Sequence, residues 1–359
     1  MPNVRTALAI ASLGIAIAAP AQNYLVAPSS YATNDAPAYG WVPGASRSLR
    51  QQTLMGASHL TPMLGTAIVA IELRRNMVDE VYQGGTAHLD VTMSIAPHEP
   101  IECSNVFANN TGTLPIQVFS GDVTFPTSPS PGNNPVPWTT NNIVRIPLTT
   151  PYPYGGGTLC IDIVGTPIAG QEANWWMADL ELEDIAGTTN DLGGGCGLYG
   201  GVDHEWSYVS RRSLVPGAHA RFSANGTPLG LALACFGTTA PSSIPLSLIL
   251  PAAPGCDLWL GTLDEIVPTI FWPPAEPADL PFGGEAEISF HLPNTSSLFG
   301  ASLTTQWVDW SQMATSNAIE WTVASAMPTA DVAVLDGDPT EATGLVSVYL
   351  AHVMRFEYQ

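Results

Sequence analysis

The chain has 359 residues, a formal net charge of −21, and ten basic residues that are all arginine. A nucleic-acid-binding protein needs a basic face, so this composition excludes that class and also disfavours binding to anionic lipid. Hydrophobic residues make up 45% of the chain, which is enough to fill two cores, and the length itself predicts two domains.

The N-terminal segment predicts export. Arg5 is a short positive region, residues 7–19 form an apolar run, and Ala19-Pro20-Ala21 is a small-x-small cleavage site. We therefore expect residues 1–21 to be a signal peptide and the mature chain to begin at Gln22. The apolar run is too short to span a bilayer, and no later segment is long and apolar enough to anchor the protein in a membrane. The mature protein is expected to be soluble, with no membrane span, and located in the periplasm, at the cell surface or outside the cell.

Strand-like segments follow one another from residue 66 to residue 184. In residues 86–96, apolar side chains alternate with polar ones, as expected of a strand with one buried face. The other strands predicted in this half are residues 66–75, 142–146, 157–165 and 175–184. The chain has 33 glycines and 32 prolines, which predict many turns and few helices. Many short strands separated by turns are typical of an antiparallel sandwich or jelly roll.

The run Gly193-Gly194-Gly195-Cys196-Gly197 is predicted to join two β modules, because glycine is unfavourable inside strands and helices. After it, strands are predicted at residues 205–210, 229–236, 256–260, 285–292, 303–310 and 318–324. Residues 327–343 are predicted to be an acidic loop. Residues 344–358 form a last long strand, which is too apolar to stay in water and must pair with a sheet.

The predicted fold is all-β, with two antiparallel β-sandwich modules of jelly-roll or Ig-like type in tandem. The first module covers residues 22–192 and the second covers residues 193–326. Residues 327–359 supply the acidic loop and the terminal strand, for which pairing with the first module is one option.

Five cysteines follow the predicted signal peptide, and export permits disulfides. No pair has CxxC spacing, which excludes a zinc ribbon and a thioredoxin motif. We predict one disulfide in each module, Cys103–Cys160 and Cys196–Cys256. Cys235 lies in the apolar run LALACF and is predicted to be a buried free thiol.

Several segments carry a resemblance. They are VFANNTG from Val106, GTLCIDIVG, the GCG joint, APGCDLWL, and QWVDW with TSNAIEWTV. Together the chain resembles a large group of uncharacterised exported proteins that are abundant in planctomycete-type bacteria. The resemblance covers most of the mature chain and implies two β-sandwich modules and export. It implies no activity and no catalytic residues.

One acidic run is a candidate calcium site. In Asp336-Gly337-Asp338-Pro339-Thr340-Glu341, the ligands would be Asp336, Asp338 and Glu341, since carboxylates on a flexible loop suit Ca²⁺. The run lacks the twelve-residue EF-hand pattern, which favours the alternative of a solvated acidic loop. No other cofactor is predicted.

No catalytic motif is present. The nucleophile elbow GxSxG and the zinc motif HExxH are both missing from the sequence. Asp203-His204-Glu205 offers potential zinc ligands, but adjacent strand residues point to opposite faces, which favours a solvated turn. No catalytic residue is therefore predicted, and a hydrolase whose residues converge only in space remains an alternative.

Tryptophan is frequent for a chain with so few charges. An exposed aromatic row on a sheet face can stack against the apolar faces of sugar rings, and Trp175, Trp272 and Trp310 are the candidate binding residues. Trp307 and Trp310 are three apart, so on a regular strand they point to opposite faces. We predict that Trp310, next to polar residues, is exposed and that Trp307 is buried.

The sequence therefore predicts an exported, non-catalytic binding or structural protein at or outside the cell surface, with polysaccharide as the leading ligand. The first alternative is an assembly protein of the envelope with no small ligand. The second is a secreted hydrolase.

Overall fold

The structure is a computed structural model, and it describes residues 23–132, 134–173, 176–197, 206–248, 255–273 and 283–359. Within these ranges every strand pairing is antiparallel and each α-helix is a single turn, so the prediction of an all-β fold is confirmed. The predicted signal peptide and Trp175 lie outside the described residues.

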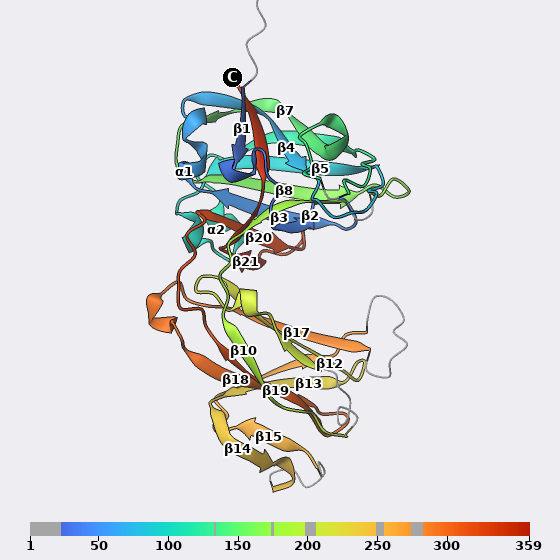
Figure 1. Cartoon of the computed structure of the whole chain (residues 1–359), viewed down its shortest axis with the longest axis vertical. Coiled ribbons are helices and arrows are strands. Elements are labelled where there is room, and N and C mark those ends of the chain that lie inside the picture. The colour runs from blue at the N-terminus through green and yellow to red at the C-terminus, as the bar shows by residue number, and fades with distance from the viewer. Residues whose placement is uncertain (1–22, 133, 174–175, 198–205, 249–254, 274–282) are drawn as a thin grey trace, which may run out of the picture.

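Three sheets make up the upper part of the molecule, which we call the first unit (Figure 1). The largest runs β21 (Leu345–Ser347), β20 (Val332–Gly337), β3 (Leu49–Met55), β8 (Leu159–Pro167), β5 (Gly85–Ile95) and β6 (Ile116–Phe125). The second runs β1 (Asn23–Ala27), β23 (Met354–Tyr358), β4 (Thr66–Arg74) and β7 (Ile143–Tyr154). The third runs β2 (Ala38–Trp41), β9 (Met177–Leu182) and β22 (Leu350–His352).

Three further sheets make up the lower part, the second unit (Figure 1). The largest runs β10 (Thr188–Gly193), β19 (Ala314–Thr322), β18 (Ser302–Asp309), β13 (Leu231–Gly237) and β16 (Glu265–Ile270). A second sheet runs β11 (Ser207–Val209), β12 (His219–Gly226) and β17 (Gly284–His291). The hairpin of β14 (Thr239–Pro245) and β15 (Asp257–Leu260) forms the third.

Short helices connect these strands. The α-helices are α1 (Ala57–Leu60) and α2 (Phe107–Asn110). The 3₁₀ turns are η1 (Ser29–Tyr31), η2 (Thr61–Met63), η3 (Pro100–Glu102), η4 (Thr140–Asn142), η6 (Arg211–Ser213), η7 (Leu246–Leu248) and η8 (Ser296–Leu298).

The C-terminal segment returns to the first unit. β20 pairs with β3, β22 pairs with β9, and β23 lies between β1 and β4. The long strand predicted over residues 344–358 is in fact three short strands in three different sheets, interrupted at residues 348–349 and at 353. Changing sheets in this way lets one apolar segment tie all three sheets of the first unit together.

Two further details differ from the sequence prediction. Residues 332–337, predicted to lie in an acidic loop, form β20, and Val332 to Leu335 are all buried. A strand that is buried on both faces has no polar alternation, which is why the pattern missed it. In addition, β10 already pairs with β19, so the chain enters the second unit before the predicted joint at residue 193.

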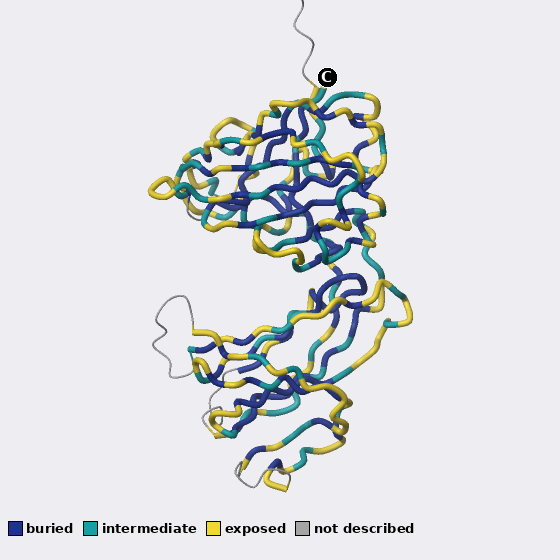
Figure 2. Tube along the Cα trace, turned by 180° about the vertical axis from the view of Figure 1, so that it is seen from behind, coloured by how far each residue is buried: buried dark blue, intermediate teal, exposed yellow. Residues whose placement is uncertain are grey.

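A buried cluster fills the waist between the two units. It combines Leu54 and Leu335 of the first unit with Val215 and Ala218 from the segment before β12, and with Ala324 after β19. Buried backbone accordingly continues through the waist (Figure 2). Burial of apolar surface holds the two units in one arrangement rather than leaving them joined by bare linkers.

One histidine links the units through a hydrogen bond. His219, at the start of β12, is buried, and its Nδ1 accepts a hydrogen bond from the backbone N–H of Val346 in β21 at 3.0 Å. Burial, together with the neighbouring His291 and Arg221, lowers the pKa of His219 from 6.5 to about 4. The unfolded chain therefore takes up a proton at a higher pH than the folded protein does. The stabilisation that depends on a neutral His219 is therefore complete above pH 6.5, and it is lost as the pH falls through the folded-state pKa.

We expect the free energy of unfolding to fall between pH 6.5 and pH 4, with His219 contributing roughly 2 kcal/mol of the loss. Urea denaturation at a series of pH values measures it. In His219→Gln the amide can still accept from Val346 but does not titrate, so the fall should be shallower. His88→Gln, a change at an exposed histidine, is the control. Parallel pH profiles for the wild type and His219→Gln would contradict this assignment.

Candidate functional site

The large sheet of the second unit has one face in the core and one face outward. On β13, Ala232, Ala234 and Phe236 point inward, into a cluster that also holds Trp307. The alternate residues Leu231, Leu233 and Cys235 therefore point outward. The β14–β15 hairpin covers part of this outer face, where Leu260 packs against Cys235 and Val308.

Beyond the hairpin, the outer face carries a row of apolar side chains across three strands. Leu231 pairs with Ile270 on one side, and its carbonyl accepts from the Trp310 backbone N–H on the other at 3.0 Å. The exposed fractions are 39% for Ile270, 40% for Leu231 and 47% for Trp310. Ile270 on β16, Leu231 on β13 and Trp310 just after β18 thus present apolar side chains to solvent next to one another.

The row continues along the edge strand β16. Ile266 and Pro268 lie on the same face as Ile270, because they pair with Cys235 and Leu233. Past the end of β16, Phe271 is buried and Trp272 is 60% exposed. We call Ile266, Pro268, Ile270, Leu231, Trp310 and Trp272 the apolar strip.

The turn that carries Trp310 is held in place by Asp309. Its Oδ2 accepts hydrogen bonds from the backbone N–H and the hydroxyl of Thr227, at 3.0 and 2.7 Å. Its Oδ1 accepts from the backbone N–H groups of Ser311 and Gln312, at 2.9 and 3.2 Å. On the other side, Trp272 exchanges two backbone hydrogen bonds of 2.8 Å with Glu285. Both indoles therefore sit on fixed backbone.

The prediction that Trp307 is buried and Trp310 is exposed is confirmed. Trp307 is 1% exposed and Trp310 is 47% exposed, as side-chain alternation predicts. Trp272 is exposed as well. The contributions of Leu231 and Ile270 were missed, because their place beside Trp310 depends on strand pairing, which no local pattern records.

The candidate calcium ligands do not form a metal site among the described residues. No group of three or more His, Cys, Asp or Glu side chains there is placed to hold a metal ion. Asp336 is a strand residue of β20 whose Oδ1 accepts from the Gln51 amide at 2.9 Å. Asp338 is exposed and accepts from the backbone N–H and hydroxyl of Thr340, at 2.8 and 2.6 Å. The two carboxylates thus have separate local partners.

One of the two predicted disulfides forms. Cys196 and Cys256 are joined, with their Cα atoms 4.9 Å apart. The prediction of Cys103–Cys160 is wrong: both residues are buried free thiols in the waist cluster, and burial raises the pKa of each. The Cys103 thiol instead lies 3.7 Å from the Ser104 carbonyl oxygen. Cys235 is a buried free thiol, as predicted.

A buried polar cluster in the first unit was not predicted from the sequence. Arg74 donates two hydrogen bonds to Oδ2 of Asp179, at 2.8 and 2.5 Å, and both side chains are buried. Burial raises the pKa of Asp179, and the charge of Arg74 opposes that rise. Buried His352 lies with Nδ1 3.4 Å from the Asp179 carbonyl oxygen. All three side chains are buried, so this cluster lies in the interior of the first unit.

Among the residues that the structure describes, no helix is both long enough and apolar enough to cross a membrane. Comparison with family models, curated proteins and solved structures finds no match for this chain. Any functional conclusion must therefore come from its own surface.

Proposed function

We propose that this protein is an exported, non-catalytic binding protein that holds a polysaccharide against the apolar strip. The observation that carries the proposal is the exposed indole of Trp310 beside Leu231 and Ile270 on the large sheet, with a second exposed indole, Trp272, two residues beyond Ile270. Indole rings offer broad, rigid apolar surfaces, and the C–H faces of sugar rings are their natural partners.

The spacing of the strip suits an extended chain of sugars. Neighbouring strands lie about 4.8 Å apart, so Trp310 and Ile270, two strands apart, are about 10 Å apart across the sheet. Trp272 extends the strip by two residues. Exposed polar side chains stand next to each indole, Glu285 beside Trp272 and Gln312 beside Trp310. Such groups can hydrogen-bond to sugar hydroxyls while the rings stack.

The assembly alternative is less well supported by the same surface. An exposed apolar edge strand such as β16 is a template for pairing with another chain. Pro268, in the middle of β16, has no N–H to donate to such a ladder. This proline protects the edge from strand addition and leaves the side-chain face, rather than the backbone, as the binding surface.

Export is part of the proposal. The Cys196–Cys256 disulfide is compatible with an oxidising compartment, where such bonds persist. The predicted signal peptide at residues 1–21 supports the same location. Mass spectrometry of secreted material should find Gln22 at the N-terminus.

Affinity electrophoresis in gels containing neutral polysaccharides, such as hydroxyethylcellulose, xylan, β-glucan and glycol chitin, tests the binding site. We expect the wild type to be retarded by at least one polymer. Trp310→Ala and Trp272→Ala should each weaken that retardation about tenfold or more, since each removes a stacking surface. Tyr39→Ala removes an aromatic residue that is 54% exposed outside the strip, and should change nothing. Retardation by no polymer, or equal retardation of the wild type and both tryptophan variants, would end the proposal.

A further inference from the structure

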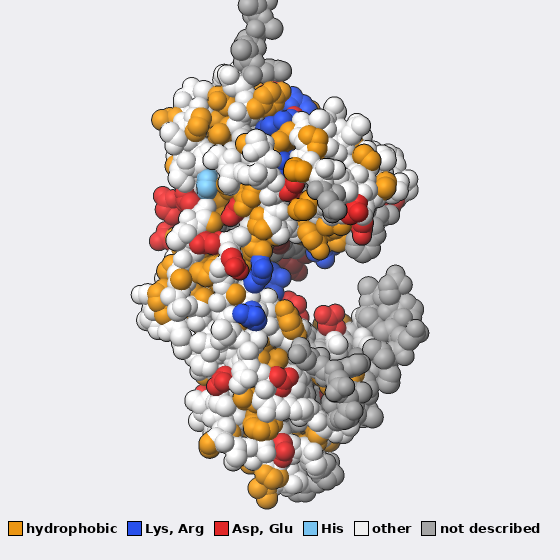
Figure 3. Space-filling view, viewed as in Figure 1, with side chains coloured by type: hydrophobic (Ala, Val, Ile, Leu, Met, Phe, Trp, Pro, Cys, Tyr) orange, Lys and Arg blue, Asp and Glu red, His pale blue; other side chains and the backbone are white. Residues whose placement is uncertain are grey.

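The first unit contains two adjoining cavities, of about 300 and 120 Å³. Both are lined by Arg47, Leu49 and Asp336, and we call the two together the first-unit cavity. Asp338 lines the larger part and Gln51 lines the smaller part. Strands β20 and β21 lie at the lower border of the first unit (Figure 1), where acidic and basic side chains stand close together on the surface (Figure 3).

The smaller part of the cavity lies between two sheets. Gln51 of β3 pairs with Asp336 of β20 in the largest sheet, and Leu49 lies on the same face of β3 as Gln51. Leu180 of β9 and Leu350 of β22 line the cavity from the third sheet. The lining is thus partly apolar, and hydrogen-bonded strands hold its polar side chains in position before any ligand binds.

Three oxygen acceptors in this lining lack a donor among the described residues. The Oε1 atom of Gln51 is buried and has no hydrogen-bond partner there. Asp336 accepts from the Gln51 amide through Oδ1, and Asp338 accepts from Thr340 through Oδ1, so the Oδ2 atom of each carboxylate is left without a donor. The Gln51 amide cannot turn over, because its oxygen would then face the Asp336 carboxylate. A ligand that brings hydrogen-bond donors would satisfy these oxygens.

The guanidinium of Arg47 has the opposite requirement, because it donates hydrogen bonds and cannot accept any. The side chain of Arg47 is exposed and forms no ion pair with a described residue. The same cavity therefore contains acceptors that lack donors and donors that lack acceptors.

This combination selects a class of ligand. An anion does not fit, because two carboxylates, Asp336 and Asp338, oppose the single guanidinium of Arg47. An ammonium group would suit the carboxylates but would leave Arg47 without an acceptor. A hydroxyl group both donates and accepts, so a neutral ligand with several hydroxyl groups satisfies the whole lining.

We propose that the first-unit cavity is a second binding site, which takes one neutral sugar unit. The hydroxyl groups of a sugar match Arg47, Gln51 and the two carboxylates, and its C–H faces match the leucines of the lining. A volume of about 300 Å³ is at the lower end of the range for small-molecule sites, which suits a single ring rather than a chain. This inference goes beyond the proposed function, since the cavity shares no residue with the apolar strip and does not depend on it.

Saturation-transfer NMR tests the site with the methyl glycosides of glucose, galactose and mannose and with the matching uronic acids. We expect at least one neutral glycoside to bind. Its uronic acid should bind about tenfold or more weakly, because the added carboxylate is repelled by Asp336 and Asp338.

Two variants probe the lining itself. Arg47→Ala removes the donors and should weaken binding of that glycoside about tenfold or more. Ser48→Trp adds an indole to the lining of the larger part and should obstruct it. Both positions are exposed, so both variants should fold, which thermal melts check. The matched control is Arg212→Ala, at an exposed arginine of η6 outside this lining, and it should have no effect.

No binding of any neutral glycoside, equal binding of the uronic acid, or unchanged affinity in Arg47→Ala and Ser48→Trp would overturn the proposal. The double variant Trp272→Ala/Trp310→Ala separates the two sites: it should lose retardation by neutral polymers and keep glycoside binding. Loss of both in that variant would place the glycoside at the apolar strip and contradict a site in the cavity. If the wild type binds a glycoside but is retarded by no polymer, the proposed function fails and this inference stands.

Discussion

Replacing Trp307 by alanine should lower the free energy of unfolding by about 3 to 5 kcal/mol, the usual cost of deleting a buried aromatic side chain. Trp307 is 1% exposed and lies in the core of the second unit with Phe222, Phe236 and Trp321. Its removal leaves a cavity between two sheets, because strands held by ladders on both sides cannot close over it. Equilibrium denaturation in urea measures the effect.

The matched control is Trp310→Ala, the same substitution three residues away. Since Trp310 is 47% exposed, its loss should change the free energy of unfolding by no more than about 0.5 kcal/mol. Equal destabilisation by the two variants would mean that Trp310 is packed in the core, and would remove the apolar strip as a binding surface.

Side-chain alternation explains why this part of the fold could be predicted from the sequence. In residues 86–96, buried apolar side chains alternate with less buried polar ones, so a strand can be predicted from the sequence pattern alone. In Gln306-Trp307-Val308-Asp309-Trp310, the first four residues are buried and only Trp310, just after the strand, is exposed. The same alternation predicts which tryptophan is exposed. At these two tryptophans, the burial predicted from the sequence matches the burial in the structure.

Where both faces of a strand are buried, its residues do not alternate between polar and apolar, and the strand cannot be predicted from that pattern. β20 was predicted as part of an acidic loop because its C-terminal end and the residues that follow are acidic. The terminal segment was predicted as one strand because its breaks at residues 348–349 and 353 are also apolar. The same holds for Cys103 and Cys160. Both lie in the waist cluster, but that they remain separate thiols depends on the packing of segments more than fifty residues apart.

The candidate sites were predictable only in part, for a related reason. A single sequence indicates that Trp310 is exposed, but the apolar strip exists because β13 lies between β16 and β18.

Removing the disulfide with Cys196→Ser/Cys256→Ser should lower the free energy of unfolding by about 4 kcal/mol. The bond closes a loop with a sequence separation of 60, and its largest effect is to restrict the unfolded chain. Denaturation in urea of the oxidised wild type, the reduced wild type and the double variant measures the loss. Reduction alone should reproduce most of it, and Cys235→Ser, a change at a thiol outside the bond, should not.

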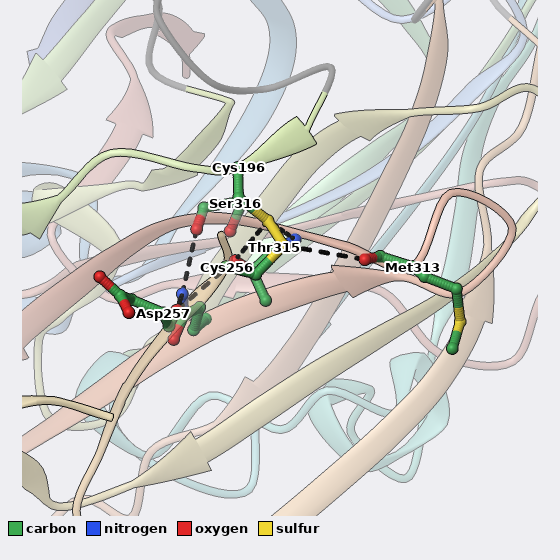
Figure 4. Close-up of a disulfide and its surroundings, with 7 residues drawn as sticks. Cys196, Cys256, Asp257, Met313, Thr315 and Ser316 are labelled. Atoms are coloured by element: carbon green, nitrogen blue, oxygen red, sulfur yellow. Dashed lines mark hydrogen bonds between the residues drawn. A yellow bond between two sulfur atoms is a disulfide. The ribbon is translucent and has the colours of Figure 1, made fainter. Parts of the chain in front are cut away.

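The surroundings of the bond explain why its loss should weaken the second unit in particular (Figure 4). The Cys196 backbone N–H donates to the Thr315 carbonyl at 3.0 Å, and the Thr315 N–H points at Cys196 Sγ at 3.1 Å. Cys256 immediately precedes β15, with its Sγ 3.8 Å from the Met313 carbonyl oxygen. The disulfide therefore fastens both the end of β10 and the covering hairpin to β19.

If reduction left the unfolding midpoint unchanged, the hairpin would be held by its apolar contacts alone. The expected result is instead a hairpin that loosens first and uncovers Cys235 and Val308 beside the apolar strip, so that thiol labelling of Cys235 becomes faster before the unit unfolds.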